Sequence, residues 1–420
     1  MSATETTTEP AVAPRGPQSL GAVFEDYRAR IRGGDVGALP ALAGVIVLVL
    51  VFTVLSGTQF TNAFNFANLV LQGSAYAVFA MGLVFVLLLG EIDLSAGYTG
   101  GVGAAVVGKL ILDQNLNWVL ALIGGLLFGA LVGLVIGLLV SKLGVPSFVV
   151  TLAFFLALQG VLLLMTGAGG TIPYRDSHLL AIMNKNMPLW LGWAFAGLTV
   201  IAYAALGFSR RLQRQRAGLP TPTILVWVLK SIAFAAVLIA ATAYLSKERS
   251  RNVFLASLKG VPIVIVIVAG LLVVLTFLLT RTAWGRHVYA VGGNAEAARR
   301  AGINVARVKI SCFMMCSMLA SVGGVLLASR TNSVNPQTGG SDVLLFAVGS
   351  AVIGGTSLFG GRGRVLDGIL GAVVITVIVN GMTLQGQSQG RVYMITGLVL
   401  LLAASVDAVS RRRAAASGRV

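Results

Sequence analysis

The sequence predicts an all-α, polytopic membrane protein with about 12 transmembrane helices, some of them broken or re-entrant. Of its 420 residues, 56% are hydrophobic and only 11% are charged, whereas a soluble protein needs a larger charged surface. The mean hydropathy is +0.89. Apolar runs of about 17 to 24 residues recur along the chain, the length at which a helix crosses about 30 Å of hydrocarbon. We therefore expect the lipid bilayer to surround most of this chain.

The apolar runs divide the chain into three parts. Residues 1–37 form a polar tail that cannot bury enough apolar area to fold alone. Residues 38–410 hold the membrane spans, and residues 411–420 form a basic tail. We expect twelve spans, at residues 39–56, 68–90, 94–112, 117–140, 147–167, 188–207, 223–245, 261–280, 309–329, 342–360, 365–385 and 391–409.

The distribution of basic residues predicts that both termini are cytoplasmic. Lysine and arginine resist translocation and stay on the cytoplasmic side. With twelve spans and the N-terminus inside, 21 of the 31 Lys and Arg fall in inner segments and 8 in outer segments. The net charge of +17 is therefore a topology signal. We do not expect nucleic-acid binding, which needs such charge on a soluble face with aromatic residues that stack on bases.

Two regions interrupt the apolar pattern. Two acids stand between the second and third expected spans, and glycine crowds residues 349–363. Non-helical backbone at membrane depth is tolerated only where protein or a water-filled cavity surrounds it. Both regions are therefore expected to be broken or re-entrant and to lie near a path, with the breaks at Glu91, Asp93, Ser95, Gly354 and Gly355.

Glu91 and Asp93 allow two interpretations. Acids within a membrane are costly and are functional candidates by default, which favours a proton or cation relay. Alternatively, Asp93 caps the helix that follows, because its side chain can accept from the first free N–H groups and the positive helix end attracts both acids.

The basic loop at residues 281–309 is expected to contain a short capped helix. Asn294 is a suitable N-cap, Ala295 to Ala301 are good helix formers, and Gly302 can end the helix. A helix of two turns is marginal in water, so it must dock. It could dock on this protein's own spans, on anionic lipid headgroups or on a cytoplasmic partner. The residues of interest are Asn294, Glu296, Ala297, Ala298, Arg299, Arg300 and Gly302.

No catalytic or metal-binding residues are expected. Gly103 to Lys109 matches most of a phosphate-binding loop, but Leu110 replaces the metal-binding Ser or Thr and no strand precedes it. His178 and His287 are isolated from each other, whereas a metal site needs clustered ligands. The chain is therefore not expected to be an enzyme, and any ATPase that drives it would be a different chain.

Four stretches carry a family resemblance. The chain resembles the permease subunits of bacterial monosaccharide ABC importers, the ribose, galactose and xylose group. The resemblance runs in order from about residue 40 to 410, and the stretch from Thr282 to Arg299 is its most specific part. The matching stretches are residues 90–97, 145–152, 282–299 with 302–305, and 352–358 followed by Gly360 and Gly361.

The resemblance implies a ten-helix core of the type II ABC importer kind with an added hairpin at residues 188–245, which turns at 208–219. Glu91 and this basic hairpin are similar to xylose-type permeases. The resemblance further implies a bacterial inner-membrane location, two permease copies, a cytoplasmic ATP-binding subunit that uses ATP and magnesium, and an extracellular sugar-binding protein. This chain itself would bind no cofactor. Loop 281–309 would couple it to the ATPase.

The expected function is ATP-driven import of a monosaccharide, xylose or a similar pentose, by alternating access. Because such sugars are neutral and rich in hydroxyls, the path should offer amides, for which the candidates are Asn68, Gln72, Gln159, Asn380 and Gln385. Each amide could equally form a packing hydrogen bond between helices. The alternatives are a proton-coupled secondary transporter that uses Glu91 and Asp93, and a membrane anchor that transports nothing.

Overall fold

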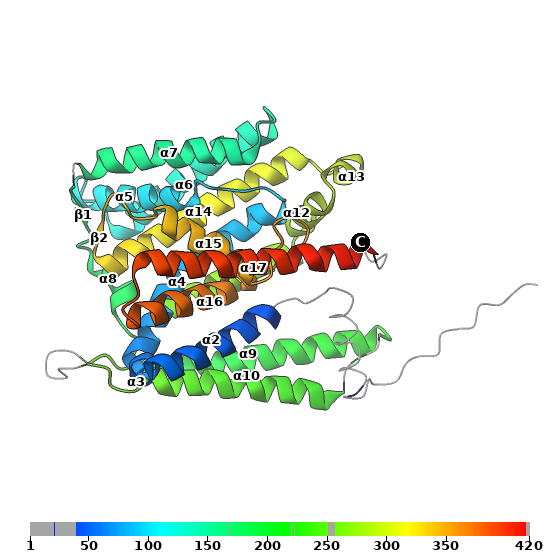
Figure 1. Cartoon of the computed structure of the whole chain (residues 1–420). Helices are drawn as coiled ribbons and strands as arrows, with labels where there is room; N and C mark the ends of the chain where they lie inside the picture. The colour runs from blue at the N-terminus through cyan, green and yellow to red at the C-terminus, as the bar shows by residue number, and fades with distance from the viewer. Residues whose placement is uncertain are drawn as a thin grey trace, which may run out of the picture.

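The protein is a bundle of long helices, which confirms the all-α polytopic class (Figure 1). The computed structural model describes residues 21, 39–167, 169–219, 221, 223–250 and 257–416. Within these residues, ten helices are long and apolar enough to cross a membrane. Two further apolar helices, of 17 and 13 residues, lie at two of the expected spans. The twelve expected spans thus correspond to ten full-length helices and two short ones.

The helices follow one another with short connections. The full-length ones are α2 (Leu39–Ser56), α4 (Ala63–Leu88), α6 (Trp118–Ser141), α7 (Ser147–Thr166), α9 (Leu189–Arg216), α10 (Ile224–Leu245), α11 (Val264–Arg281), α14 (Val305–Thr331), α16 (Val365–Leu384) and α17 (Gln389–Ala416). The shorter ones are α3 (Thr58–Thr61), α5 (Ala96–Leu112), α8 (Ser177–Asn184), α12 (Ala283–Gly293), α13 (Ala295–Arg300) and α15 (Ser341–Ile353).

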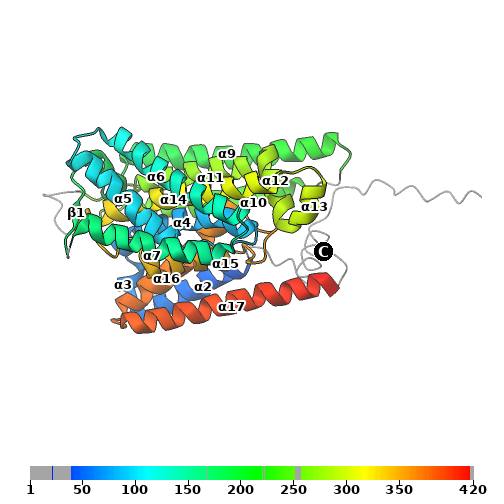
Figure 2. The same cartoon turned by 90° about the horizontal axis from the view of Figure 1, so that it is seen from above.

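The bundle has two distinct ends. The antiparallel pair β1 (Ile172–Pro173) and β2 (Ser333–Val334) lies at one end with α3, and we name this the β1 end. Helices α12 and α13 lie at the opposite end, the α13 end, where α17 also finishes (Figures 1 and 2). Residues 1–20, 22–38 and 417–420 lie outside the described residues, so the expected N-terminal tail and the last residues of the basic tail are not placed.

Helices α4, α14 and α16 form the centre of the bundle, because most of each is buried by its neighbours. Helix α6 packs against α14 through a stripe of small residues: a Cβ added at Gly129 or Gly133 would fall within 2.5 Å of an α14 backbone oxygen. This stripe, at every fourth residue, lets the two helices approach closely. In contrast, α2, α9 and α10 are largely exposed, as expected for helices that face lipid.

Two expectations about loops were wrong in detail. The hairpin at 188–245 exists as α9 and α10, but α9 continues to Arg216, so the chain turns at residues 217–223 and not from residue 208. Loop 281–309 contains an additional helix, α12, before the expected short one. Thr282 caps α12, since its hydroxyl accepts from the Gly285 N–H at 3.1 Å. The end of α9 and helix α12 were expected to be loop because their polar residues lie outside the apolar runs.

Candidate transport path and coupling junction

Helix α15 begins inside the bundle, not at its surface. After α14 ends at the β1 end, residues 335–340 return into the bundle without helical structure and pack on the first turns of α5. A Cβ at Gly101 would lie 2.1 Å from the Thr338 carbonyl oxygen, so only glycine allows this approach. At 13 residues, α15 spans about 20 Å, too short to cross a membrane alone. This segment is the re-entrant part of the fold.

The glycine-rich stretch that was expected to be broken contains the end of α15. Gly354 ends α15 and Gly355 follows it in the left-handed region with φ of 119°. Both residues belong to the loop at the α13 end, which runs from 354 to 364. A second non-helical stretch, residues 335–340, precedes α15 and packs on α5 inside the bundle.

A group of polar side chains surrounds the start of α15, and we name it the central polar cluster. Gln72 lies one helical turn before Tyr76 on α4, and Gln159 lies one turn after Phe155 of α7, against which Tyr98 packs. A Cβ built at Gly340 would lie 3.5 Å from an Asp342 carboxylate oxygen and 3.7 Å from the Tyr98 hydroxyl, so the first turn of α15 lies beside Tyr98. The cluster consists of Asn68, Gln72, Tyr76, Tyr98, Gln159, Arg330 and Asp342.

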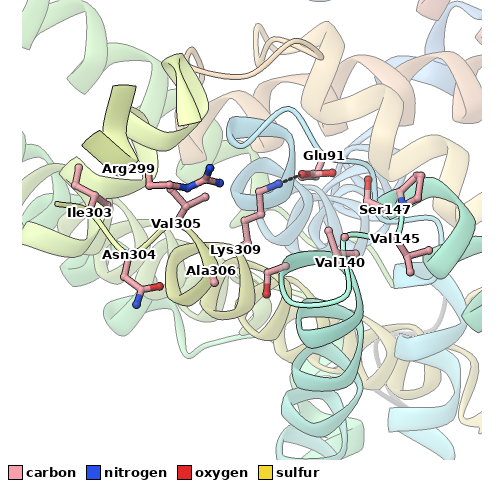
Figure 3. A pocket seen from close by; sticks show the side chains of 13 residues that line it. Glu91, Val140, Val145, Ser147, Arg299, Ile303, Asn304, Val305, Ala306 and Lys309 are labelled. Atoms are coloured by element: carbon pink, nitrogen blue, oxygen red, sulfur yellow. Dashed lines mark hydrogen bonds and ion pairs between the residues drawn. The ribbon is translucent and has the colours of Figure 1, made fainter. Parts of the chain in front are cut away.

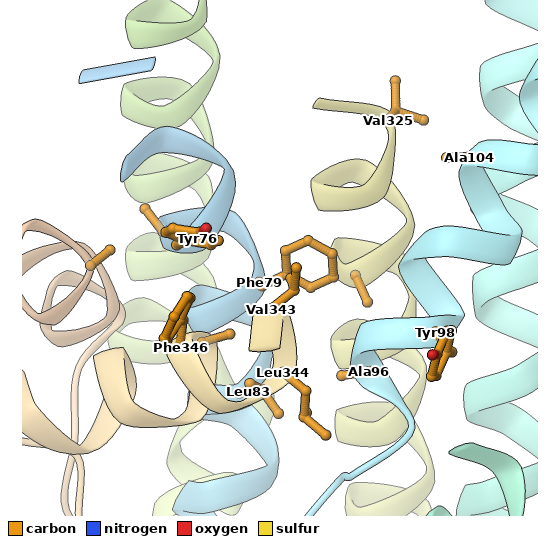
Figure 4. Packing of buried hydrophobic residues seen from close by; sticks show 14 of the residues in the cluster. Tyr76, Phe79, Leu83, Ala96, Tyr98, Ala104, Val325, Val343, Leu344 and Phe346 are labelled. Carbon is orange, nitrogen blue, oxygen red and sulfur yellow. The ribbon is translucent and has the colours of Figure 1, made fainter. Parts of the chain in front are cut away.

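Aromatic rings and a partly buried cation complete this cluster. Tyr76 packs edge-on against Phe346 of α15 with 5.5 Å between ring centroids, as Figure 4 shows. Tyr98 packs in the same manner against Phe155, at 4.9 Å. Arg330, at the end of α14, donates to the Asn68 amide oxygen at 2.9 Å. The cluster therefore combines amides, hydroxyls, one carboxylate and aromatic faces, the groups that suit a neutral hydroxyl-rich ligand.

Three of the five path candidates lie in this cluster: Asn68, Gln72 and Gln159. The other two lie apart from it. Asn380 and Asn65 exchange two hydrogen bonds of 2.9 Å and are both buried, so this amide joins α16 to α4. Gln385 donates to the Ser56 hydroxyl at 2.6 Å near the β1 end. The geometry of Asn380 and Gln385 favours a role in packing between helices over a role in the path.

The break between α4 and α5 contains the two acids. Asp93 is buried, and its Oδ1 accepts from the Ser95 N–H at 2.9 Å and from the Ser95 hydroxyl at 2.6 Å. These bonds form an Asx turn that leads into α5, whose N-cap residue is Ser95 without a side-chain capping bond, so the expected cap by Asp93 is wrong in detail. Glu91 forms an ion pair with Lys309 of α14. Glu91 thus has an ion-pair partner and Asp93 Oδ1 has Ser95, whereas the buried Asp93 Oδ2 has no hydrogen-bond partner among the described residues.

The Glu91–Lys309 pair lies in a cavity at the α13 end (Figure 3). The cavity has a volume of about 650 Å³ and is lined by parts of α6, α7 and α14 and by the segment after α13. Arg299 of α13 extends into it toward the pair. A movement of α13 would therefore alter the surroundings of the pair that joins α14 to the α4–α5 break.

Helix α13 is capped at both ends. The Asn294 side chain accepts from the N–H groups of Glu296 and Ala297 at 3.0 and 2.9 Å. At the other end, the Gly302 and Ile303 N–H groups bond to the carbonyls of Arg299 and Ala298, a Schellman arrangement for which Gly302 adopts φ of 83°. These local bonds explain why so short a helix forms.

One face of α13 packs on the bundle and the other is open. Ala298 is buried, with Ala295 and Ile303 beside it. Arg299 and Arg300 pair with Glu296 at 2.8 and 3.4 Å, and their side chains are 66% and 80% exposed. The helix thus docks partly on its own protein, with Arg300 turned outward and Arg299 exposed while lining the cavity that holds the Glu91–Lys309 pair.

Helix α12 connects α13 to the rest of the bundle, and its role was not predicted. Trp284 donates to the Ser311 hydroxyl of α14 at 2.7 Å and its ring lies 5.7 Å from that of Phe85 on α4. Tyr289 donates to the Gly363 carbonyl oxygen at 2.8 Å. The apolar side of α12 could have been recognised from Trp284, Val288 and Val291, which recur at helical spacing.

Backbone contact holds the end of α12 against two other segments. A Cβ at Gly292 would lie 1.8 Å from the Leu88 carbonyl oxygen, at the end of α4, and 2.9 Å from the Gly361 nitrogen. The Gly361 N–H in turn donates to the same Leu88 oxygen at 2.9 Å. We name this meeting of α12, α4 and loop 354–364 the coupling junction. Sequence reasoning missed it because the contacts involve no side chains.

No cluster of His, Cys, Asp and Glu that could hold a metal ion occurs within the described residues. Arg330 and Asp342 stand near the ends of apolar runs in the sequence, and the structure brings both into the central polar cluster. Their proximity depends on the re-entrant segment, for which the sequence offers no local signal.

Comparison with known proteins identifies the family. The family model described as the permease component of branched-chain amino acid transport systems matches residues 65–404. The xylose transport system permease protein XylH of Escherichia coli is 34% identical over 374 residues, which cover 89% of this chain and 92% of that protein. XylH of Haemophilus influenzae is 31% identical, with 89% and 96% covered. The ribose import permease protein RbsC of Escherichia coli is 31% identical, with 87% and 92% covered.

No solved structure matches the chain significantly. The relatives are transport permeases, and the match extends over nearly their whole length. The chain therefore belongs to the permease family that includes the xylose and ribose transport permeases, and it is a multi-pass protein of the inner membrane.

Proposed function

We propose that this chain is the permease subunit of an ATP-driven importer of a monosaccharide, with xylose or a similar pentose as substrate. The observation that carries this proposal is the capped helix α13, which exposes Arg299 and Arg300 and leads through α12 directly into the coupling junction. Such an element is suited to receive force from a separate protein. The named substrates of the relatives support the sugar class.

The partner at α13 would be a cytoplasmic ATP-binding subunit, which alone uses ATP and magnesium. The α13 end then faces the cytoplasm, and both termini lie on that side, in agreement with the distribution of basic residues. Two copies of the permease would enclose the path, and an extracellular sugar-binding protein would deliver substrate at the β1 end.

The central polar cluster would form part of the sugar path. Gln72 and Gln159 supply amide groups, Tyr76 and Tyr98 supply hydroxyls, and the start of α15 supplies free N–H groups at membrane depth. These groups can replace the water that a sugar loses on entering the bundle. Motion at the coupling junction reaches this cluster, because α4 carries both Leu88 and Gln72.

Charge reversal on α13 tests the proposal. The double variant Arg299→Glu/Arg300→Glu should lose ATP-dependent sugar uptake in proteoliposomes while its amount in the membrane stays unchanged, because both side chains are exposed and pair only within α13 among the described residues. The matched control is Arg286→Glu/Arg307→Glu, which changes the same charge at exposed positions near α13. Retained ATP-dependent uptake in the α13 variant, or uptake driven by a pH gradient without any ATPase, would contradict the proposal.

A further inference from the structure

A basic cavity lies between α9 and α10, close to the turn that joins them. Its volume is about 350 Å³. Arg210, Arg211 and Arg214 line it from α9, and Lys230 lines it from α10. No carboxylate occurs among its described lining residues, and within the described parts of the chain no acid forms an ion pair with Arg210, Arg214 or Lys230. The cavity therefore concentrates positive charge in a concave site.

Aromatic packing gives the cavity a fixed wall. The Trp227 indole N–H donates to the Ala204 carbonyl oxygen at 3.1 Å, and a Cβ at Gly207 would lie 3.0 Å from that indole nitrogen. Phe208 packs against Trp227 with 5.4 Å between ring centroids. Because the indole is held on α9, the two helices are joined beside the cations and the cavity does not depend on flexible side chains alone.

The cavity opens where a lipid would meet it. Helices α9 and α10 are among the most exposed spans, and Leu206, beside the cavity, is 58% exposed. At 28 residues α9 is about 42 Å long, so its basic end extends beyond the hydrocarbon to the level of the headgroups. Arg210 and Lys230 each lie about 9 to 10 Å along a helix from the turn, so they are at the same depth.

We propose that this cavity binds the phosphate group of an anionic phospholipid, with the acyl chains along the exposed faces of α9 and α10. Arginine and lysine favour phosphate oxygens, and basic pockets between spanning helices suit anionic headgroups. An isolated Lys or Arg at a helix end can extend to the headgroups without forming a defined lipid site. Here, several cations from two helices converge on one apolar-walled cavity, which favours one bound lipid for each chain.

Native mass spectrometry of the delipidated full-length protein in detergent tests this inference, with dioleoylphosphatidylglycerol, dioleoylphosphatidylethanolamine or inorganic phosphate added separately. We expect one phosphatidylglycerol to bind each chain, and the triple variant Arg210→Gln/Arg214→Gln/Lys230→Gln to bind it at least about tenfold more weakly. The matched control Arg281→Gln/Arg286→Gln/Arg307→Gln removes the same charge at the same end of the bundle and should bind like the wild type.

Several results would overturn the inference. One is that phosphatidylglycerol and phosphatidylethanolamine bind equally, and another is that both triple variants lose the same amount of phosphatidylglycerol binding. A third is that inorganic phosphate binds as tightly as the lipid, which would indicate a soluble phosphate ligand. If the triple variant does not fold, phosphatidylglycerol with brominated acyl chains provides a second measurement on the intact protein. It should quench the fluorescence of the wild type more than that of Trp227→Phe, and equal quenching would contradict the site.

Discussion

Replacing Gly292 with alanine tests whether α12 moves together with α4 through backbone contact. The new Cβ would lie 1.8 Å from the Leu88 carbonyl oxygen, whereas Cβ atoms essentially never approach a heavy atom within 3.0 Å. The end of α12 and the end of α4 must therefore separate by at least about 1.2 Å, the difference between these two distances. Both obstacles, the Leu88 oxygen and the Gly361 nitrogen, are main-chain atoms and cannot turn aside.

The adjacent glycine offers a matched control. A Cβ at Gly293 would have no heavy atom within 4 Å. Both substitutions gain helix propensity, by up to about 1 kcal/mol, but only Gly292→Ala adds overpacking, which costs about 1–3 kcal/mol. We therefore expect the free energy of unfolding of Gly292→Ala to be lower than that of Gly293→Ala by about 1–3 kcal/mol.

Two measurements on these variants separate stability from coupling. Thermal unfolding in one detergent, followed by tryptophan fluorescence, should give a lower Tm for Gly292→Ala than for Gly293→Ala. Proteoliposomes that also contain the ATPase should show less sugar uptake per ATP hydrolysed for Gly292→Ala, because the separated junction transmits less motion. Equal Tm values would refute the backbone contact. A lower Tm with unchanged uptake per ATP would refute its role in coupling.

Two further predictions concern charged groups. Reversing the charge of either Glu91 or Lys309 should lower the free energy of unfolding by about 1–3 kcal/mol, between the values for exposed and buried pairs, because the side chains are only 16% and 22% exposed. In chemical denaturation, the double variant with the two charges exchanged should recover part of this loss. If the losses of the two single variants simply add in the double variant, the ion pair is contradicted. Hydrogen bonds from the Ser250 and Leu258 N–H groups lower the pKa of Glu248 to about 2. Its contribution to loop stability is therefore present above the usual carboxyl pKa and is lost as the pH falls toward 2. Glu248→Gln should therefore remove the pH dependence of the protection factor of the Leu258 amide, its exchange rate relative to that of an unfolded peptide at the same pH.

Local chemistry explains which parts of the fold could be predicted. Helix α13 was predicted nearly to its ends because Asn294 and Gly302 cap it through bonds within a few residues. The capping role weighed for Asp93 was wrong in detail, because Asp93 bonds to Ser95 in a turn just before α5 and Ser95 is the N-cap residue. Helix α12 was missed because its polar residues dilute the apolar run, although its apolar spacing was visible.

The central polar cluster could not be predicted, because long-range folding brings its members together. Arg330 and Asp342 stand near the ends of apolar runs, where charges normally face water, and the sequence alone gives them no role. They enter the bundle because residues 335–340 fold back onto α5, where Gly101 leaves room for the Thr338 carbonyl. A side chain on one of the two segments in this contact would exclude the other segment. The contact is therefore specified by the absence of side chains at two positions that are distant in the sequence.

The same physical reason links the central polar cluster to the coupling junction. At both places, main chain touches main chain, and such contacts deform less than contacts between flexible side chains. Helix α4 carries a contact of each region, with Leu88 in the junction and Gln72 in the central polar cluster. Displacing Leu88 by about an ångström should therefore shift the Gln72 side of the central polar cluster as a rigid element. Under the proposed function, a force applied at α13 would reach the start of α15 in this way, without side chains that relay the movement one by one.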